Sequence, residues 1–298
     1  MAGETIIWDG DTSEVYTLAA NWQGAAAPEA TQLVYFPAGN ENPVAGSDQK
    51  DTALGSFNVL PGYTAAIGSI ADGKPTPLII TATTVNLDIA VASYLDLRTV
   101  TVANVTGAAA LLGEGLSGLN LAAGAGAAAV TTLNINIPSG ESVGLAALAG
   151  QSGTFTTINI DGDGEVHIGA GVTCTTVNVG GNAQVALDCA CTTLNLTEGA
   201  PAVRHTAGAI TTVNVHKGRY INNSAGTIGT THIHADGLVD CSEGHVARAM
   251  TTIHRYGDGG FLDPNKLVTW TELKVYGGLG NDRLDLGSFM ELTRAALA

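Results

Sequence analysis

The sequence predicts an all-β protein that folds as a single-chain parallel β-helix (β-solenoid) of about ten turns. Three observations support this fold. A five-residue phrase of the form Thr-Thr-x-Asn-x recurs at nearly regular intervals, and a second short strand candidate recurs between its copies. The composition also combines small residues with little charge: 39 of the 298 residues are Gly, and charged residues make up 13%. Such a chain suits many short strands stacked around a narrow interior.

Copies of the phrase define the repeat. The step between successive copies ranges from 17 residues (Thr175 to Thr192) to 25 residues (Thr131 to Thr156). A left-handed coil of hexapeptide units keeps a strict turn length, so this variation favours a right-handed coil with loops at its corners. The clean copies are Thr83–Leu87, Thr131–Ile135, Thr156–Ile160, Thr175–Val179, Thr192–Leu196 and Thr211–Val215.

Each turn also contains a second strand candidate, and an apolar residue precedes each Thr pair. Three apolar sides per turn predict a roughly triangular coil. The second strand candidates are Glu165–Ile168, Gln184–Leu187, Ala202–His205, Tyr220–Asn222 and Leu238–Asp240. We divide the chain into an N-terminal β cap or docking segment (1–50), a parallel β-helix (51–255) and a C-terminal part (256–298). The helical spacing of apolar residues predicts a short capping helix over 289–297.

Side-chain alternation along a strand predicts which side of the phrase faces solvent. If the first Thr and the aliphatic residues point inward, the second Thr and the Asn point outward and form two columns on a flat, uncharged face. Three interpretations are open: stacking for stability, an interface between copies packed about a common axis, and ice binding, which the Asn column disfavours. The residues are Thr132, Asn134, Thr157, Asn159, Thr176, Asn178, Thr193, Asn195, Thr212 and Asn214.

Two patterns suggest metal ligands, each beside a plainer alternative. Gly277–Asp285 resembles the nonapeptide of calcium-binding β-rolls (the RTX repeat), which implies calcium ligation by Gly carbonyls and Asp282; a single copy also fits a tight turn and strand. His232 and His234 lie on one face of a strand, and copies about a three-fold axis could hold an octahedral metal. The alternative is a solvated polar face. No other cofactor is expected.

The net charge of −15 excludes phosphate backbones as partners, because an acidic surface repels them. Met1–Thr5 lacks the basic region of a secretory signal, and no apolar run is long enough to span a membrane, so we expect neither export nor a membrane partner. The four Cys lack the C-x-x-C spacing of a zinc site. We therefore expect free thiols in a reducing cytoplasm.

The N-terminal segment carries a resemblance. It contains Trp8-Asp9-Gly10, then Ala19-Ala20-Asn21-Trp22, and then a β-run that ends at Phe36. This pattern resembles phage β-helical virion structural proteins of the capsid decoration (cement) type, and more weakly autotransporter-like β-helix passengers. The resemblance implies a homotrimer that is made in the host cytoplasm and placed on the capsid surface. Trp8, Asn21 and Trp22 would then belong to a segment that docks on the major capsid protein.

Enzymatic activity is not expected. A polysaccharide-cleaving enzyme on this fold would need two or three carboxylates in one groove. Asp161, Asp163 and Glu165 do cluster, but their Gly spacing indicates a tight turn first, with a calcium loop or a catalytic pair as alternatives. Two rival functions therefore stay open: a tailspike or receptor-binding protein that recognises surface polysaccharide, and a bacterial surface adhesin, which would need an export signal.

Overall fold

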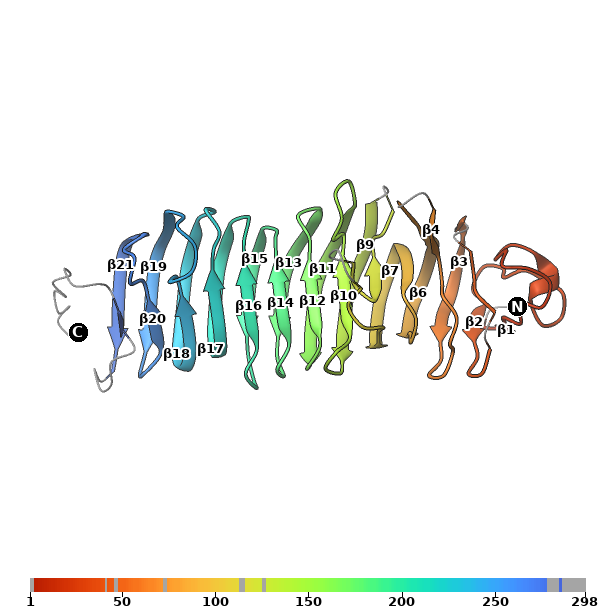
Figure 1. Cartoon of the computed structure of the whole chain (residues 1–298), viewed down its shortest axis with the longest axis horizontal. Coiled ribbons are helices and arrows are strands. Elements are labelled where there is room, and N and C mark those ends of the chain that lie inside the picture. The colour runs from red at the N-terminus through yellow and green to blue at the C-terminus, as the bar shows by residue number, and fades with distance from the viewer. Residues whose placement is uncertain are drawn as a thin grey trace. The chain divides into compact units, whose positions relative to one another are not determined.

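The computed structural model describes residues 3–277, apart from short gaps at 41, 46–47, 72–73, 113–115 and 125–126, together with residues 284–285. The chain divides into two compact units, Met1–Cys174 and Thr175–Ala298. Within each unit, parallel strands follow one another turn after turn (Figure 1).

In the first unit, most strands form one long parallel ladder, in which each strand pairs with the strand one turn later. Its members are β1 (Thr5–Ile7), β2 (Leu33–Phe36), β3 (Asp48–Val59), β6 (Leu78–Asp88), β7 (Ser93–Gly107), β9 (Ala127–Ile137) and β11 (Ser152–Gly162). A second ladder joins the start of β7 to β8 (Leu119–Leu121), β10 (Ser142–Leu145) and β12 (Glu165–Ile168). A small antiparallel hairpin, β4 (Ser69–Ala71) and β5 (Lys74–Thr76), projects from this coil.

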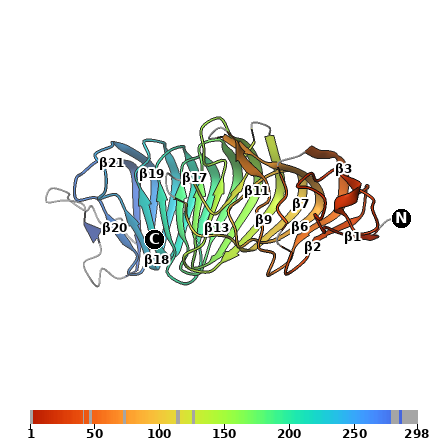
Figure 2. The same cartoon turned by 45° about the vertical axis from the view of Figure 1, so that its right-hand side comes forward.

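The second unit also contains two parallel ladders. The first ladder contains β13 (Val172–Val179), in which the unit begins, and then β15 (Cys191–Leu196), β17 (Ile210–Asn222), β18 (Ile228–Asp240), β19 (Arg248–Tyr256) and β21 (Val268–Tyr276). The second ladder contains β14 (Gln184–Leu187), β16 (Ala202–His205), the later halves of β17 and β18, β20 (Gly260–Leu262) and β22 (Leu284–Asp285). Figure 2 shows β17, β18 and β19 as neighbours in this unit.

Columns of aliphatic and aromatic side chains fill the interior, because residues in register point the same way in every turn. One column of the first unit is fully buried: Val34, Phe57, Val85, Ala103, Leu133 and Ile158. Burying a large aliphatic side chain contributes about 1.5–3 kcal/mol. Toward the end of the second unit the interior becomes polar, since Thr231 follows Val213 and Arg255 follows Ile233 in their columns.

The phrase bends the strand at its first Thr. Phe155 and Ile158 are fully buried, but both residues between them, Thr156 and Thr157, face outward. The parallel register passes from Phe155 directly to Thr157 and omits Thr156. The prediction that the first Thr points inward with the aliphatic residues was therefore wrong: two successive outward residues make a corner of the coil, where the alternation of a flat strand does not hold.

Glycine is required at corners where one turn lies on the next. Gly199 and Gly218 have φ angles of +75° and +77°. A Cβ on Gly199 would lie 2.0 Å from the Gly181 carbonyl oxygen, and one on Gly218 would lie 2.2 Å from the Pro201 carbonyl oxygen. Any larger residue would push adjacent turns apart, which accounts for part of the high Gly content.

These observations confirm the predicted all-β parallel β-solenoid, with about 11 turns against the ten expected. The predicted right-handedness and the division at residues 50 and 255 stay predictions. The predicted helix over 289–297 lies outside the described residues. Among the residues that are described, no helix has the length and apolar content needed to cross a membrane.

Candidate functional site

The predicted polar face contains a hydrogen-bonded column of Asn side chains, here called the amide column. In the first unit each Asn donates from Nδ2 to Oδ1 of the Asn one turn earlier. The four bonds are Asn86 to Asn58 (2.7 Å), Asn104 to Asn86 (2.8 Å), Asn134 to Asn104 (2.8 Å) and Asn159 to Asn134 (2.8 Å). Asn58, Asn86 and Asn104 extend the column beyond the residues chosen from the sequence.

The second unit repeats this arrangement. Asn195 donates to Asn178 and Asn214 donates to Asn195, each over 2.7 Å. Beyond Asn214 the same register position is taken by His232, His254 and Lys274. The face therefore changes there from neutral amides to imidazoles and an ammonium group.

The second Thr of each phrase forms a column beside the amides. Thr132 pairs in register with Thr157, and Thr193 with Thr212; these four residues and Thr176 are half-buried. Four Asn inside the columns each use one N–H group and one oxygen lone pair along the coil: Asn86, Asn104, Asn134 and Asn195. An amide has two N–H groups and two acceptor sites, so hydrogen-bonding capacity is left over for water or a partner. These side chains supply no group that is charged or that titrates near neutral pH.

The three residues selected as docking candidates form part of a buried aromatic cluster. Trp8 and Trp22 are buried and meet edge-to-face, with ring centroids 5.0 Å apart, and both pack on Phe36. Asn21 is also buried: its Oδ1 accepts the backbone N–H groups of residues 12 and 13, and its Nδ2 donates to the Val15 carbonyl. These side chains hold the segment together, so a docking surface here would consist of their exposed neighbours.

Such neighbours line an open depression of about 420 Å³ in the N-terminal segment. Its wall includes Asp9, Asp11, Gln23, Asn40 and Asn42. Amide groups of Asn40 and Asn42 donate to the backbone carbonyl of Asp9 and fix the wall. Among the described residues, none forms a hydrogen bond with the buried Oδ1 atom of Asp9. The depression is thus acidic and rich in acceptors, and it suits a partner that brings hydrogen-bond donors.

In the second unit, four His and two Tyr gather on one outer surface, which we call the imidazole–tyrosine cluster. Four of its rings stack nearly parallel, with interplanar angles of 16°, 13° and 10°: His216, His234, Tyr256 and Tyr276. The other two imidazoles, His232 and His254, meet edge-to-face with centroids 4.9 Å apart. Burial, followed by the neighbouring imidazoles, lowers the pKa of His232 and of His234, so both rings are neutral at pH 7.

The predicted pair of His232 and His234 thus takes part in two different contacts. His232 lies beside His254, whereas His234 is stacked between His216 and Tyr256. Within the described part of the chain, no three His, Cys, Asp or Glu side chains are grouped so that they could hold a metal ion. The other predicted metal ligand, Asp282, lies outside the described residues.

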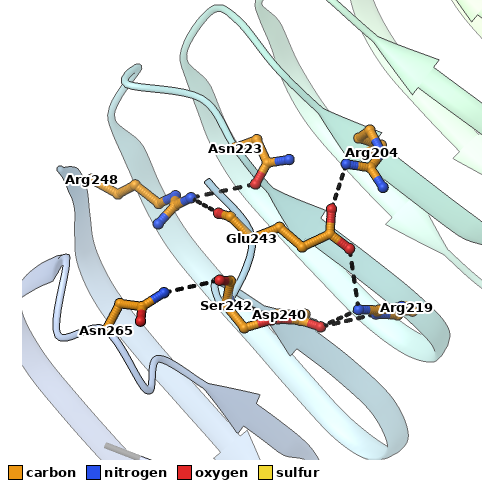
Figure 3. Close-up of polar contacts among 8 residues, drawn as sticks. All are labelled: Arg204, Arg219, Asn223, Asp240, Ser242, Glu243, Arg248 and Asn265. Atoms are coloured by element: carbon orange, nitrogen blue, oxygen red, sulfur yellow. Dashed lines mark hydrogen bonds and ion pairs between the residues drawn. The ribbon is translucent and has the colours of Figure 1, made fainter. Parts of the chain in front are cut away.

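A charged cluster lies over the second ladder of the second unit (Figure 3). Arg219 donates from Nε to Asp240 Oδ2 over 3.0 Å, and the Glu243 carboxylate forms ion pairs with Arg204 and, at 3.5 Å, with Arg219. Burial raises the pKa of Asp240, but hydrogen bonds from Ser242 and the contact with Arg219 outweigh it and leave this pKa below its usual value. The carboxylate of Asp240 is therefore held ionised and is a poor general acid.

The second ladder continues from β16 into β17 in register: Arg204 pairs with Ile221, and the buried His205 pairs with the buried Asn222. The four Cys are buried. Asp161 and Gly162 are the last two residues of β11, with Gly162 at φ +88°, and a bend at Asp163 and Gly164 leads into β12.

Comparisons with protein-family models, curated proteins and solved structures found no significant match.

Proposed function

We propose that the protein is a non-enzymatic virion structural protein: a homotrimeric decoration (cement) protein that binds the major capsid protein and stabilises a phage head. The observation that carries this proposal is the uncharged outer face of Thr and Asn columns. It combines spare hydrogen-bonding capacity with a flat, regular geometry and has no acid, base or nucleophile. Copies of one surface related by cyclic symmetry can pack along a common axis through such a face.

Two further observations support a scaffold. The carboxylates of the charged cluster form ion pairs with Arg204 and Arg219, so they are suited to a structural role more than to proton transfer. In the first unit, Trp8 and Trp22 pack on Phe36, whose ring lies 5.0 Å from that of Phe57 inside the coil. This packing supports a cap over an open end of a solenoid. The proposal includes a right-handed coil and a C-terminal capping helix over 289–297.

Attachment to the capsid would use the exposed wall of the N-terminal depression, with Asp9, Asp11 and Asn42 among its groups. The protein would be synthesised in the host cytoplasm and would then be located on the capsid surface. Docked trimers would add buried surface at junctions between capsid subunits and so resist internal pressure.

The oligomer is tested with one pair of variants. Thr132 is half-buried in the proposed interface column, whereas the adjacent Thr131 is exposed at the corner of the same turn. We expect the native chain to be a trimer by light scattering coupled to size exclusion. Thr132→Lys should dissociate it because a desolvated ammonium is costly in an interface, and Thr131→Lys should not. Circular dichroism confirms that each variant is folded.

A monomeric native protein, or equal behaviour of the two variants, would refute the proposed face. Capsid binding is tested separately by co-sedimentation with expanded capsids from the source virus, with binding lost on Asp9→Arg. If the protein does not bind capsids but binds or cleaves a surface polysaccharide in a glycan screen, it would instead belong to the tailspike class.

A further inference from the structure

Three polar atoms converge inside the imidazole–tyrosine cluster. The hydroxyl oxygen of Tyr256 lies 3.2 Å from Nδ1 of His232 and 3.3 Å from Nδ1 of His254. These residues come from two paired strands, since His232 and His254 are register partners in β18 and β19, and Tyr256 is two residues further along β19. One hydroxyl can donate only one hydrogen, so at least one imidazole has to donate to the hydroxyl oxygen.

The separations match those of ligands around a single metal ion. Imidazole nitrogens and oxygens bind first-row divalent metals at about 2.0–2.2 Å. Neighbouring ligands at that distance are about 3.0 Å apart in an octahedral site and about 3.4 Å apart in a tetrahedral site. The two separations between the Tyr256 hydroxyl oxygen and the imidazole nitrogens fall inside this interval.

The surroundings hold these atoms in place. The ring of Tyr256 is stacked between His234, at 4.9 Å, and Tyr276, at 5.0 Å, which limits the movement of its hydroxyl group. His232 and His254 are half-buried against each other. A neutral imidazole has a lone pair to offer a metal ion. A donor set held in position before binding loses little entropy when the ion arrives.

We propose that Nδ1 of His232, Nδ1 of His254 and Oη of Tyr256 form a site for a first-row divalent transition metal, with copper(II) preferred. Two imidazoles and a phenolate suit copper, nickel and zinc, and copper(II) is the tightest in the divalent series. The metal–oxygen bond replaces the O–H bond of Tyr256, and the released proton passes to solvent; water completes the coordination. The site differs from the predicted pair because His254, and not His234, is the partner of His232.

The site shares no residue with the Thr and Asn columns and is independent of the proposed virion role, so the two can fail separately. The test uses the full chain without an affinity tag and titrates it with copper(II) and with zinc(II) by calorimetry. We expect one equivalent to bind, with copper tighter than zinc. His232→Gln and His254→Gln should each weaken copper binding at least tenfold, which is about 1.4 kcal/mol. His245→Gln, in an exposed loop, is the matched control and should bind like the native chain.

Tyr256→Phe separates ligation from packing, because Phe keeps the ring stack and removes only the oxygen. We expect this variant to lose the phenolate-to-copper charge-transfer absorption band while its melting temperature stays close to that of the native chain. Absence of saturable binding by the native chain overturns the site. Binding that is unaffected by both His variants overturns it equally. Loss of affinity in the His variants with an unchanged band in Tyr256→Phe overturns the role of the phenol.

Discussion

His205 should make the stability of the second unit fall steeply in mild acid. Its side chain is buried, with Nε2 lying 2.6 Å from the Ala207 carbonyl oxygen and Nδ1 lying 2.8 Å from the Tyr220 hydroxyl. A carbonyl oxygen can only accept, so Nε2 carries the proton and Nδ1 accepts from Tyr220. Burial raises the pKa of Tyr220 well above its usual value, which keeps that hydroxyl protonated as a donor. Both nitrogens of the neutral ring are thus satisfied, and protonation of Nδ1 would displace the hydrogen that the Tyr220 hydroxyl donates to it.

The magnitude follows from linkage. Burial lowers the pKa of His205 from 6.5 to about 4. Between these values the unfolded chain binds the proton and the folded chain does not, so stability is lost as the pH falls through that window. From pH 7 to pH 5 this one residue should cost about 2 kcal/mol of the free energy of unfolding, and below pH 4 about 3 kcal/mol.

His205→Gln provides the comparison, because an amide can donate to Ala207 and accept from Tyr220 without titrating. Urea unfolding of both proteins at pH 7 and pH 5 isolates His205, since the other His residues are common to both. The stability difference between native and variant should shift by about 2 kcal/mol in favour of the variant. An unchanged difference would refute the argument, as would an NMR titration in which the His205 ring protonates near pH 6.5.

Two further predictions concern interior and surface columns. Asn134→Ala removes the two hydrogen bonds that Asn134 forms with its neighbours in the amide column and should lower the free energy of unfolding by about 1–3 kcal/mol. Asn214→Ala removes one such bond and should lower it by about half as much. Denaturant unfolding compares the two variants, and equal losses of stability would count against the column. Arg255 is buried, and its Nη1 atom has no hydrogen-bond partner, nor does any carboxylate among the described residues form an ion pair with it. Arg255→Met should therefore raise the stability by about 1–4 kcal/mol, and a lower melting temperature would show that the guanidinium is paired after all.

The repeat period carried the fold prediction, because residues that recur once per turn are brought into register by the coil itself. Thr-Thr-x-Asn-x located the Asn column for this reason, and the buried aliphatic residues followed from alternation. Alternation failed where the chain leaves a flat strand. Thr156, at a corner, lies on the side opposite to the one expected. A local bend changes the side-chain direction by one residue, and the sequence does not mark where it occurs.

Contacts between turns were harder to predict than positions within a turn. His232 and His234 are two residues apart and attracted attention as a pair, yet the contact of His232 is with His254, one turn later. Only the register between β18 and β19 reveals it. His205 gave no signal at all, because an inward His in a short apolar strand looks like any other polar residue until its two hydrogen-bond partners are known.

The amide column has a direction. In both units the six bonds described above run from the Nδ2 atom of the later Asn to the Oδ1 atom of the earlier one. At the start of the first unit's column, Asn58 donates in the same sense to the Val34 carbonyl. Because the amide dipoles align and polarise one another, the two ends are chemically unlike. A group that precedes the column has to accept a hydrogen bond, as the Val34 carbonyl does. A group that extends the column beyond Asn214 has to donate one.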